Sequence, residues 1–328
     1  LAVALRLAAV IRREGIDIIR ATEPCYCGLI AMVTAMLTGR PWCVSLHADF
    51  DRRFALDGPA VAATVFGSRA LANAIERLVI SRAPMTLPIR ESLIGYLKAR
   101  GARADRIRVI PHGLDISVFA TPSAIDVSAR FDVPSGHRIV SFVGRLARDN
   151  YIDDVLDVAR HIAATRGDVV MLMIGGGTEE ARVRAEVSGN PGLARVVRMP
   201  GYQPRDVVAA VRQASAVSLC LMGGFSLIEA CAAASPVVAY DVEWHGELVR
   251  DGETGYLIAE HDLAGLYVAV DRLLDRPDYA RKLGQAAQHL ALARHDHAAS
   301  AAAKRKAYAE LLELENRGVR CAFRRSAP

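Results

Sequence analysis

Apolar residues recur along the chain in two alternating patterns: short continuous runs, and longer stretches at helical spacing. In the first third the runs "IDIIRA", "PWCVSLH", "MTLPI" and "RIRVIPHG" predict strands, and residues 1–15, 23–39, 69–83 and 90–101 predict helices. The alternation restarts at "RIVSFVGR" and continues through "DVVMLMIG", "ARVVRMPGY", "AVSLCL", "SPVVAY" and "GETGYLI". Helical spacing separates these later runs, and the tail from Leu263 to about Glu315 is helical in pattern.

Near-continuous Val, Ile and Leu strands between amphipathic helices are typical of parallel sheets covered on both faces. Residues 115–137 interrupt the pattern with Pro122, Pro134 and Gly136, which indicates a domain boundary. The predicted fold class is therefore α/β, with two Rossmann-like domains facing across a cleft. We expect an N-terminal domain at 1–122, a C-terminal domain at 123–295, and a helix with a basic tail at 296–328.

The composition of the chain argues against several functional classes. No apolar run reaches the ~18 residues that a transmembrane helix needs, and no secretory signal or cysteine framework is present. These features predict a cytoplasmic protein. Aromatic residues make up 6% of the chain, and no dense basic stripe suggests nucleic acid as a partner.

Charge is uneven along the chain. Residues 1–122 carry 16 basic and 10 acidic side chains, whereas 123–303 carry 18 and 23. A weakly basic surface of this kind suits an anionic membrane or a phosphate-bearing acceptor. We therefore expect a peripheral contact with the inner face of the cell membrane, with a merely solvated surface as the open alternative.

Candidate chemistry follows the strand ends, where open parallel sheets bind ligands. A glycine turn that opens a helix presents backbone N–H groups and the positive end of the helix dipole, which suits a diphosphate. Gly223-Gly224 precede such a helix, with Glu229 expected in its first turn, and Arg145 adds a cation after another strand. The alternative for Ser226 and Glu229 is a capping box with no ligand. No cluster has the spacing of metal ligands, so we expect no metal.

Five segments in order carry a family resemblance: "VSLHADF", "VIPHGLD", "FVGRL", "GGFSLIEACAAASPVVAYDV" and "ELVRDGETGYLI". Together they resemble the retaining glycosyltransferases of family 4, which have the GT-B architecture of two Rossmann-like domains. The likeness runs from residue 1 to about 315. It implies transfer of a sugar, with retention of configuration, from a nucleotide-diphosphate sugar to a glycan or a polyprenyl- or other lipid-linked acceptor. The implied process is cell-envelope or exopolysaccharide biosynthesis, with the nucleotide sugar as co-substrate and no cofactor.

The resemblance also implies roles for individual residues. His47 would approach the transferred sugar as the catalytic-site histidine, Arg145 would bind the diphosphate, and Glu229 would hydrogen-bond the ribose. Asp49 and His112 would lie on the acceptor side. The implied donor-binding set is Arg145, Asn150, Gly201, Tyr202, Gly223, Gly224, Phe225, Ser226 and Glu229.

The chain departs from the family pattern at three places. Asn150 stands where the family usually has Lys, and Leu221 stands where the donor-site motif has its first Glu. The chain also begins at Leu1 inside a helical pattern, after the family's first strand and glycine-rich loop, so we expect a truncated N-terminal domain, intact donor binding and weak transfer. The missing Lys and Glu favour one alternative, a non-catalytic nucleotide-binding or partner subunit. A nucleotide-sugar epimerase on the same two-domain architecture is a second alternative.

Overall fold

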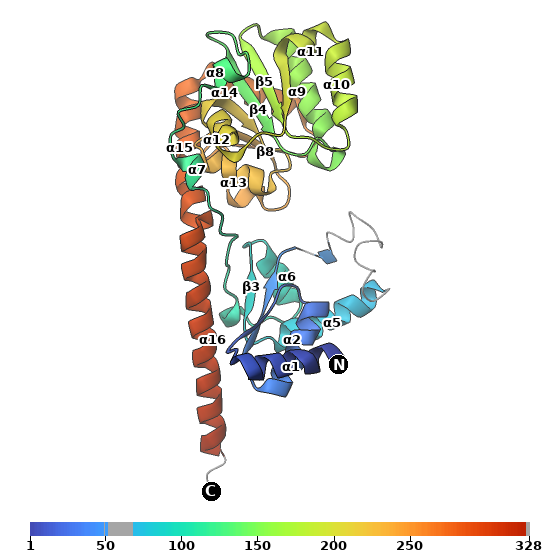
Figure 1. Ribbon diagram of the computed structural model, residues 1–328, viewed down its shortest axis with the longest axis vertical. Helices are drawn as coiled ribbons and strands as arrows, with labels where there is room; N and C mark the ends of the chain where they lie inside the picture. The colour runs from blue at the N-terminus through green and yellow to red at the C-terminus, as the bar shows by residue number, and fades with distance from the viewer. Residues whose placement is uncertain (49, 52–67, 326–328) are drawn as a thin grey trace. The chain divides into compact units, whose positions relative to one another are not determined.

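The computed structural model of the chain describes residues 1–48, 50–51 and 68–325. Internal contacts divide the chain into two compact units (Figure 1), one of Leu1–His112 with Ala298–Pro328 and the other of Gly113–His297. The contacts thus group the final helix with the first unit, which the pattern of residues 296–328 did not indicate. The predicted domain limits at 122 and 295 remain predictions.

The first unit is built on a parallel three-stranded sheet in the order β1-β2-β3. Its strands are β1 (Ile19–Ala21), β2 (Trp42–Leu46) and β3 (Thr86–Pro88). Helix α1 (Ala2–Glu14) precedes β1, α2 (Tyr26–Thr38) lies between β1 and β2, and α5 (Arg69–Arg82) lies between β2 and β3. Helix α6 (Leu93–Ala99) and the short 3₁₀ helix η1 (Ala104–Arg106) follow β3. The parallel pairing explains why each strand is followed by a helical crossover.

Alternate residues of β2 point to opposite faces of this sheet, and each face is covered. Trp42 and Val44 pack in a core with residues of α2 and α5. Cys43 packs on the other face, in a core that includes Ala307 and Leu311 of α16 (His297–Arg325). Because these two α16 residues are four apart, they lie on one face of that helix.

The second unit holds six parallel strands in the order β6-β5-β4-β7-β8-β9. The strands are β4 (Arg138–Val143), β5 (Val169–Ile174), β6 (Val197–Gly201), β7 (Ser215–Leu219), β8 (Val237–Tyr240) and β9 (Tyr256–Ile258). Numbered within the unit, this order is 3-2-1-4-5-6, which is the doubly wound arrangement. The chain reverses its direction across the sheet between β4 and β7, and ligands of such sheets bind beside that point.

Helices cover both faces of the second sheet (Figure 1). One face carries α9 (Ile152–Thr165), α10 (Glu180–Gly189), α11 (Pro191–Val196) and α14 (Leu263–Asp275). The other carries α7 (Ser117–Ala120), α8 (Val127–Arg130), α12 (Arg205–Ala214), α13 (Gly224–Ala232) and α15 (Pro277–His295). The 3₁₀ turns η2 (Arg148–Asn150) and η3 (His245–Glu247) lie in loops that follow strands.

The strand predicted at residues 106–113 is wrong. Ile107 forms a single parallel bridge to Thr86, and Ile110 donates its N–H to the Pro88 carbonyl at 2.8 Å, but no strand results. Pro111 ends the pairing because it has no N–H to donate. Helix α11 and the division of the tail into three helices were also not predicted.

Candidate functional site

A cavity of about 340 Å³ lies at the carboxyl ends of β4, β5 and β6, within the second unit. It brings together three residues of the predicted donor set, Arg145, Tyr202 and Glu229, from three separate segments. A larger hollow of about 570 Å³ lies against residues 128–137, in the irregular segment before β4, and contains none of the predicted site residues. The remaining lining of the smaller cavity comes from Phe119, Val143, Gly144, Ile174, Gly175, Gln203, Arg205 and Val208.

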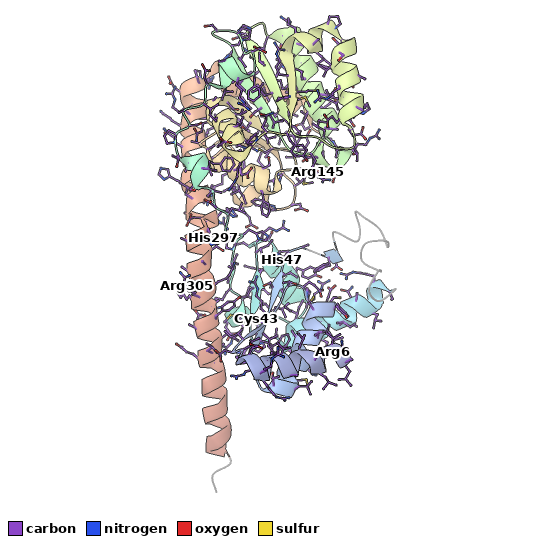
Figure 2. All side chains as sticks on the ribbon, in the orientation of Figure 1. Arg6, Cys43, His47, Arg145, His297 and Arg305 are labelled. Carbon is purple, nitrogen blue, oxygen red and sulfur yellow. The ribbon has the colours of Figure 1, made fainter. Side chains whose placement is uncertain are left out.

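Arg145 lies in the loop that follows β4 (Figure 2) and is two-thirds exposed. Its Nη2 donates to Asp149 Oδ2 at 2.6 Å, so the guanidinium already has an anionic partner four residues along the chain. Asn150, predicted to meet the donor, is instead buried, and its Nδ2 donates to the Arg145 carbonyl at 2.9 Å. Asn150 therefore fixes the loop backbone and brings no positive charge to the cavity.

Glycine allows the β4 and β5 loops to approach each other closely. Gly175 has φ of +129°, and a Cβ atom there would lie 2.0 Å from the Gly144 carbonyl oxygen. The Gly175 N–H also donates to the Gly201 carbonyl at 3.0 Å, which joins the loop to the end of β6. The glycines after β5 thus serve backbone packing beneath the cavity, where a side chain has no room.

The start of α13 differs from the predicted helix start. The helix begins at Gly224, so Glu229 is its sixth residue, and the predicted position in the first turn is wrong. The capping box is wrong for the same reason, since Ser226 lies inside the helix. Its hydroxyl donates to the Val143 carbonyl at 2.6 Å and accepts from Arg212 Nη2 at 2.6 Å. Ser226 therefore ties α13 to the end of β4.

The backbone N–H of Gly223 was predicted to face the donor, but it is already hydrogen-bonded within the protein. It donates to Nε2 of the buried His245 at 3.1 Å. The other ring nitrogen of His245 lies 2.8 Å from the Tyr240 carbonyl, which only an Nδ1–H can donate to, so Nε2 is left as the acceptor. Gly224 and Phe225 are exposed at the helix start but do not line the cavity.

Glu229 is half-buried, and its carboxylate makes no hydrogen bond or ion pair with any residue that the structure describes. Burial raises the pKa of this carboxyl, and the positive charges of Arg212 and Arg205 act in the opposite direction. A carboxylate that lines a cavity with its oxygens unoccupied is suited to accept hydrogen bonds from ligand hydroxyl groups.

Two arginines near Glu229 were not predicted. Arg205 begins α12 directly after the β6 loop, lines the cavity, donates to the Asp115 carbonyl, and lies 5.2 Å over the Phe119 ring. The rule that ligands bind at strand ends, which predicted Arg145, could also have found Arg205, because it follows the end of β6 closely. Arg212 is fully buried, and only the tertiary fold reveals that it lies near Glu229.

The predicted residues of the first unit form a separate group. The His47 and His112 rings lie with centroids 5.3 Å apart, and Arg90 Nη2 donates to the His47 carbonyl at 2.9 Å. Burial and nearby arginines lower the pKa of His47, and the same causes, with His47 and Lys304, lower that of His112. Asp49 lies outside the described residues.

Two further properties concern only the part of the chain that the structure describes. There, no group of three or more His, Cys, Asp or Glu side chains is arranged to hold a metal ion. None of the helices found there combines the length and the apolar character needed to cross a membrane.

Comparison with known proteins gives two family matches. Residues 126–290, half of the chain, match the family described as Glycosyl transferases group 1, and residues 1–113 match the Glycosyl transferase 4-like domain. The D-inositol 3-phosphate glycosyltransferase of Nocardiopsis dassonvillei is 29% identical over 276 residues, which cover 79% of this chain and 63% of that protein. The 2-deoxystreptamine glucosyltransferase of Streptomyces kanamyceticus is 30% identical over 258 residues, covering 76% and 65%. The chain thus spans less than two thirds of these two relatives.

Solved structures with the same fold include a sucrose-phosphate synthase from Thermosynechococcus elongatus. Its TM-score is 0.75 at 22% identity, over 95% of this chain and 77% of that one. HepE from Anabaena, in complex with UDP, has a TM-score of 0.76 at 16% identity, over 94% and 82%. At these identities the likeness establishes the fold, which is the GT-B fold of glycosyltransferases, as predicted.

Proposed function

Because the chain belongs to the glycosyl transferases group 1 family, we propose that it transfers a sugar from a nucleoside-diphosphate sugar to a glycan or lipid-linked acceptor. One observation carries the proposal: Arg145, Arg205 and Glu229 line a single cavity beside the point where the second sheet reverses its order. Two arginines can neutralise a diphosphate, and an unoccupied carboxylate can accept hydrogen bonds from ribose hydroxyls. The same cavity can therefore hold both the diphosphate and the ribose of the nucleotide.

The leaving diphosphate gains negative charge as its bond to the sugar breaks. Arg145 would stabilise this charge after exchanging Asp149 for the diphosphate. We propose retention of configuration, with the acceptor oxygen bonding to the anomeric carbon on the face that the diphosphate leaves. A phosphate oxygen would take the acceptor proton. Glu229 is the one carboxylate among the described residues that line the cavity, so this route fits better than one that needs a pair of carboxylates.

The acceptor side would be supplied by the first unit. We propose that His47 contacts the transferred sugar and that Asp49 and His112 shape the acceptor site. The excess of basic residues in 1–122 supports an acceptor or membrane surface of negative charge. The process would be cell-envelope or exopolysaccharide synthesis, in the cytoplasm at the inner face of the membrane.

The proposal is tested by incubating the protein with a panel of UDP-, GDP- and ADP-sugars and candidate acceptors, and analysing the products. We expect one sugar to be transferred with release of the nucleoside diphosphate, and Arg145→Ala to abolish most of the transfer. Arg281→Ala is the matched control, because Arg281 is equally exposed and pairs with Asp278 at 3.1 Å on α15, outside the cavity lining. Absence of nucleotide binding to the unaltered protein would refute the proposal.

A second candidate function is a non-catalytic nucleotide-binding subunit. Asn150 favours it, because its buried amide holds the loop and supplies no charge where the resembling family has Lys. A thermal shift induced by UDP or GDP, with no product from any sugar nucleotide in the panel, would support this candidate. Interconversion of two sugar nucleotides without an acceptor would instead indicate an epimerase.

A further inference from the structure

A second group of cationic side chains lies at the carboxyl edge of the first sheet, entirely within the unit of residues 1–112 and 298–328. We call it the strand-edge cluster: Arg20 in β1, His47 after β2, Arg90 after β3, His112, and Lys304 on α16. The position matters because ligands of parallel sheets bind beyond the carboxyl ends of the strands. His47 is labelled at this edge in Figure 2.

Two members of the strand-edge cluster have no anionic partner among the described residues. Arg20 donates from Nε to Ser45 Oγ at 2.7 Å and from Nη1 to the Tyr308 hydroxyl at 3.3 Å, and both partners are neutral. Lys304, one turn before Tyr308 on α16, makes no hydrogen bond or ion pair with a described residue. Among the described residues, both charges therefore remain uncompensated at the sheet edge.

Other charged residues of the same unit are arranged differently. Arg69 pairs with the buried Glu76 at 2.7 Å, and Arg100 pairs with the same carboxylate at 3.0 Å. Carboxylates thus compensate charges in this unit, but no carboxylate of a described residue pairs with Arg20 or Lys304. The charges of Arg20 and Lys304 repel other cations nearby, and an anionic ligand relieves that repulsion.

The two imidazoles respond to this positive field. The pKa of His47 is lowered by burial and then by Arg20 and Arg90. The pKa of His112 is lowered by burial and then by His47, Arg90, Lys304 and Arg20. The positive field at this edge therefore disfavours the imidazolium form of both histidines.

We propose that the strand-edge cluster binds a phosphate group of the acceptor, a proposal that rests on the transferase function proposed above. Several cationic donors from separate strands match a group that carries close to two negative charges and three oxygens. The acceptor phosphate belongs either to a soluble sugar phosphate or to a polyprenyl-phosphate headgroup, since both present the same chemistry.

The test follows the two histidines by NMR while inorganic phosphate is added at constant ionic strength, with UDP present to occupy the cavity of the second unit. Bound phosphate should raise the pKa of both His47 and His112, because a nearby anion stabilises the imidazolium form. Lys304→Gln and Arg20→Gln should each weaken phosphate binding roughly tenfold, as loss of one charge-assisted contact does. Arg77→Gln, at an exposed arginine of α5, is the control and should leave it unchanged.

Two arms identify the source of the phosphate. Glucose 6-phosphate should compete with inorganic phosphate if the acceptor is soluble, whereas cosedimentation with polyprenyl-phosphate vesicles, but not phosphatidylcholine vesicles, would indicate the lipid. Histidine pKa values that stay constant in phosphate, or equal affinity in Lys304→Gln, Arg20→Gln and Arg77→Gln, would overturn the inference. If UDP still binds in that case, the donor proposal stands alone. If phosphate binds at the histidines and UDP does not bind, the donor proposal fails while the anion site stands.

Discussion

Asp149 competes with a bound diphosphate for Arg145, so Asp149→Asn should tighten nucleotide binding. The two side chains are joined at 2.6 Å and are 63% and 66% exposed, respectively. An ion pair this exposed is worth about 0.2–1 kcal/mol. Because binding must break it, its removal should lower the dissociation constant for UDP roughly 1.4- to 5-fold. Loss of a negative charge beside the phosphates acts in the same direction.

Isothermal calorimetry on the unaltered protein and four variants separates these effects. Arg145→Ala should weaken UDP binding about tenfold or more, since a charge-assisted hydrogen bond contributes roughly 1.5–3 kcal/mol. When Arg145 is already replaced by Ala, the Asp149→Asn change should no longer give most of its increase in affinity for UDP. Asp278→Asn, which breaks the comparably exposed pair with Arg281, should leave affinity unchanged. Weaker UDP binding by Asp149→Asn, or an equal gain with and without Arg145, would refute the competition.

Three further predictions concern the surroundings of the cavity. Affinity for UDP should fall as pH drops through the pKa of Glu229, which lies above its ordinary 4.5, because the protonated carboxyl loses its capacity as a charged acceptor. Glu229→Gln should remove that part of the pH dependence. A pH profile identical to that of the unaltered protein would contradict the role of Glu229 in binding UDP. Arg212→Met should raise the pKa of Glu229 further and move the pH midpoint of binding upward; an unmoved midpoint would exclude the coupling. Gly175→Ala should destabilise the protein by roughly 2–5 kcal/mol in denaturant titration, since its Cβ would meet the Gly144 carbonyl at 2.0 Å, whereas Gly167→Ala, with nothing within 4 Å, should be neutral.

Strand and helix alternation was predictable because buried parallel strands leave an apolar signal that needs no knowledge of distant contacts. The position of Arg145 after a predicted strand located it at the ligand-binding edge, whereas Tyr202 was supplied by the family resemblance. The strand predicted at 106–113 was wrong because an apolar run alone resembles a strand. Pro111 and its neighbours allow only one β-bridge, from Ile107 to Thr86. The local pattern of apolar residues does not show how many residues of a segment pair with a neighbouring strand.

The details of α13 and its neighbours depend on contacts between distant residues. Gly223 donates to His245, 22 residues away, and Ser226 donates to Val143, 83 residues away. These bonds, and not a capping box, hold the start of α13. The partnership of α16 with the first sheet, through Ala307 and Leu311, is likewise invisible in the local sequence.

A structure of the protein with UDP bound would show whether the cavity between the β4 loop and α13 is the nucleotide site, as we claim. We expect the diphosphate at hydrogen-bonding distance from the Arg145 guanidinium, which will have left Asp149, and a ribose hydroxyl donating to Glu229. UDP bound in the hollow at residues 128–137, or in the cavity with Arg145 still paired to Asp149 and Glu229 uncontacted, would contradict the claim.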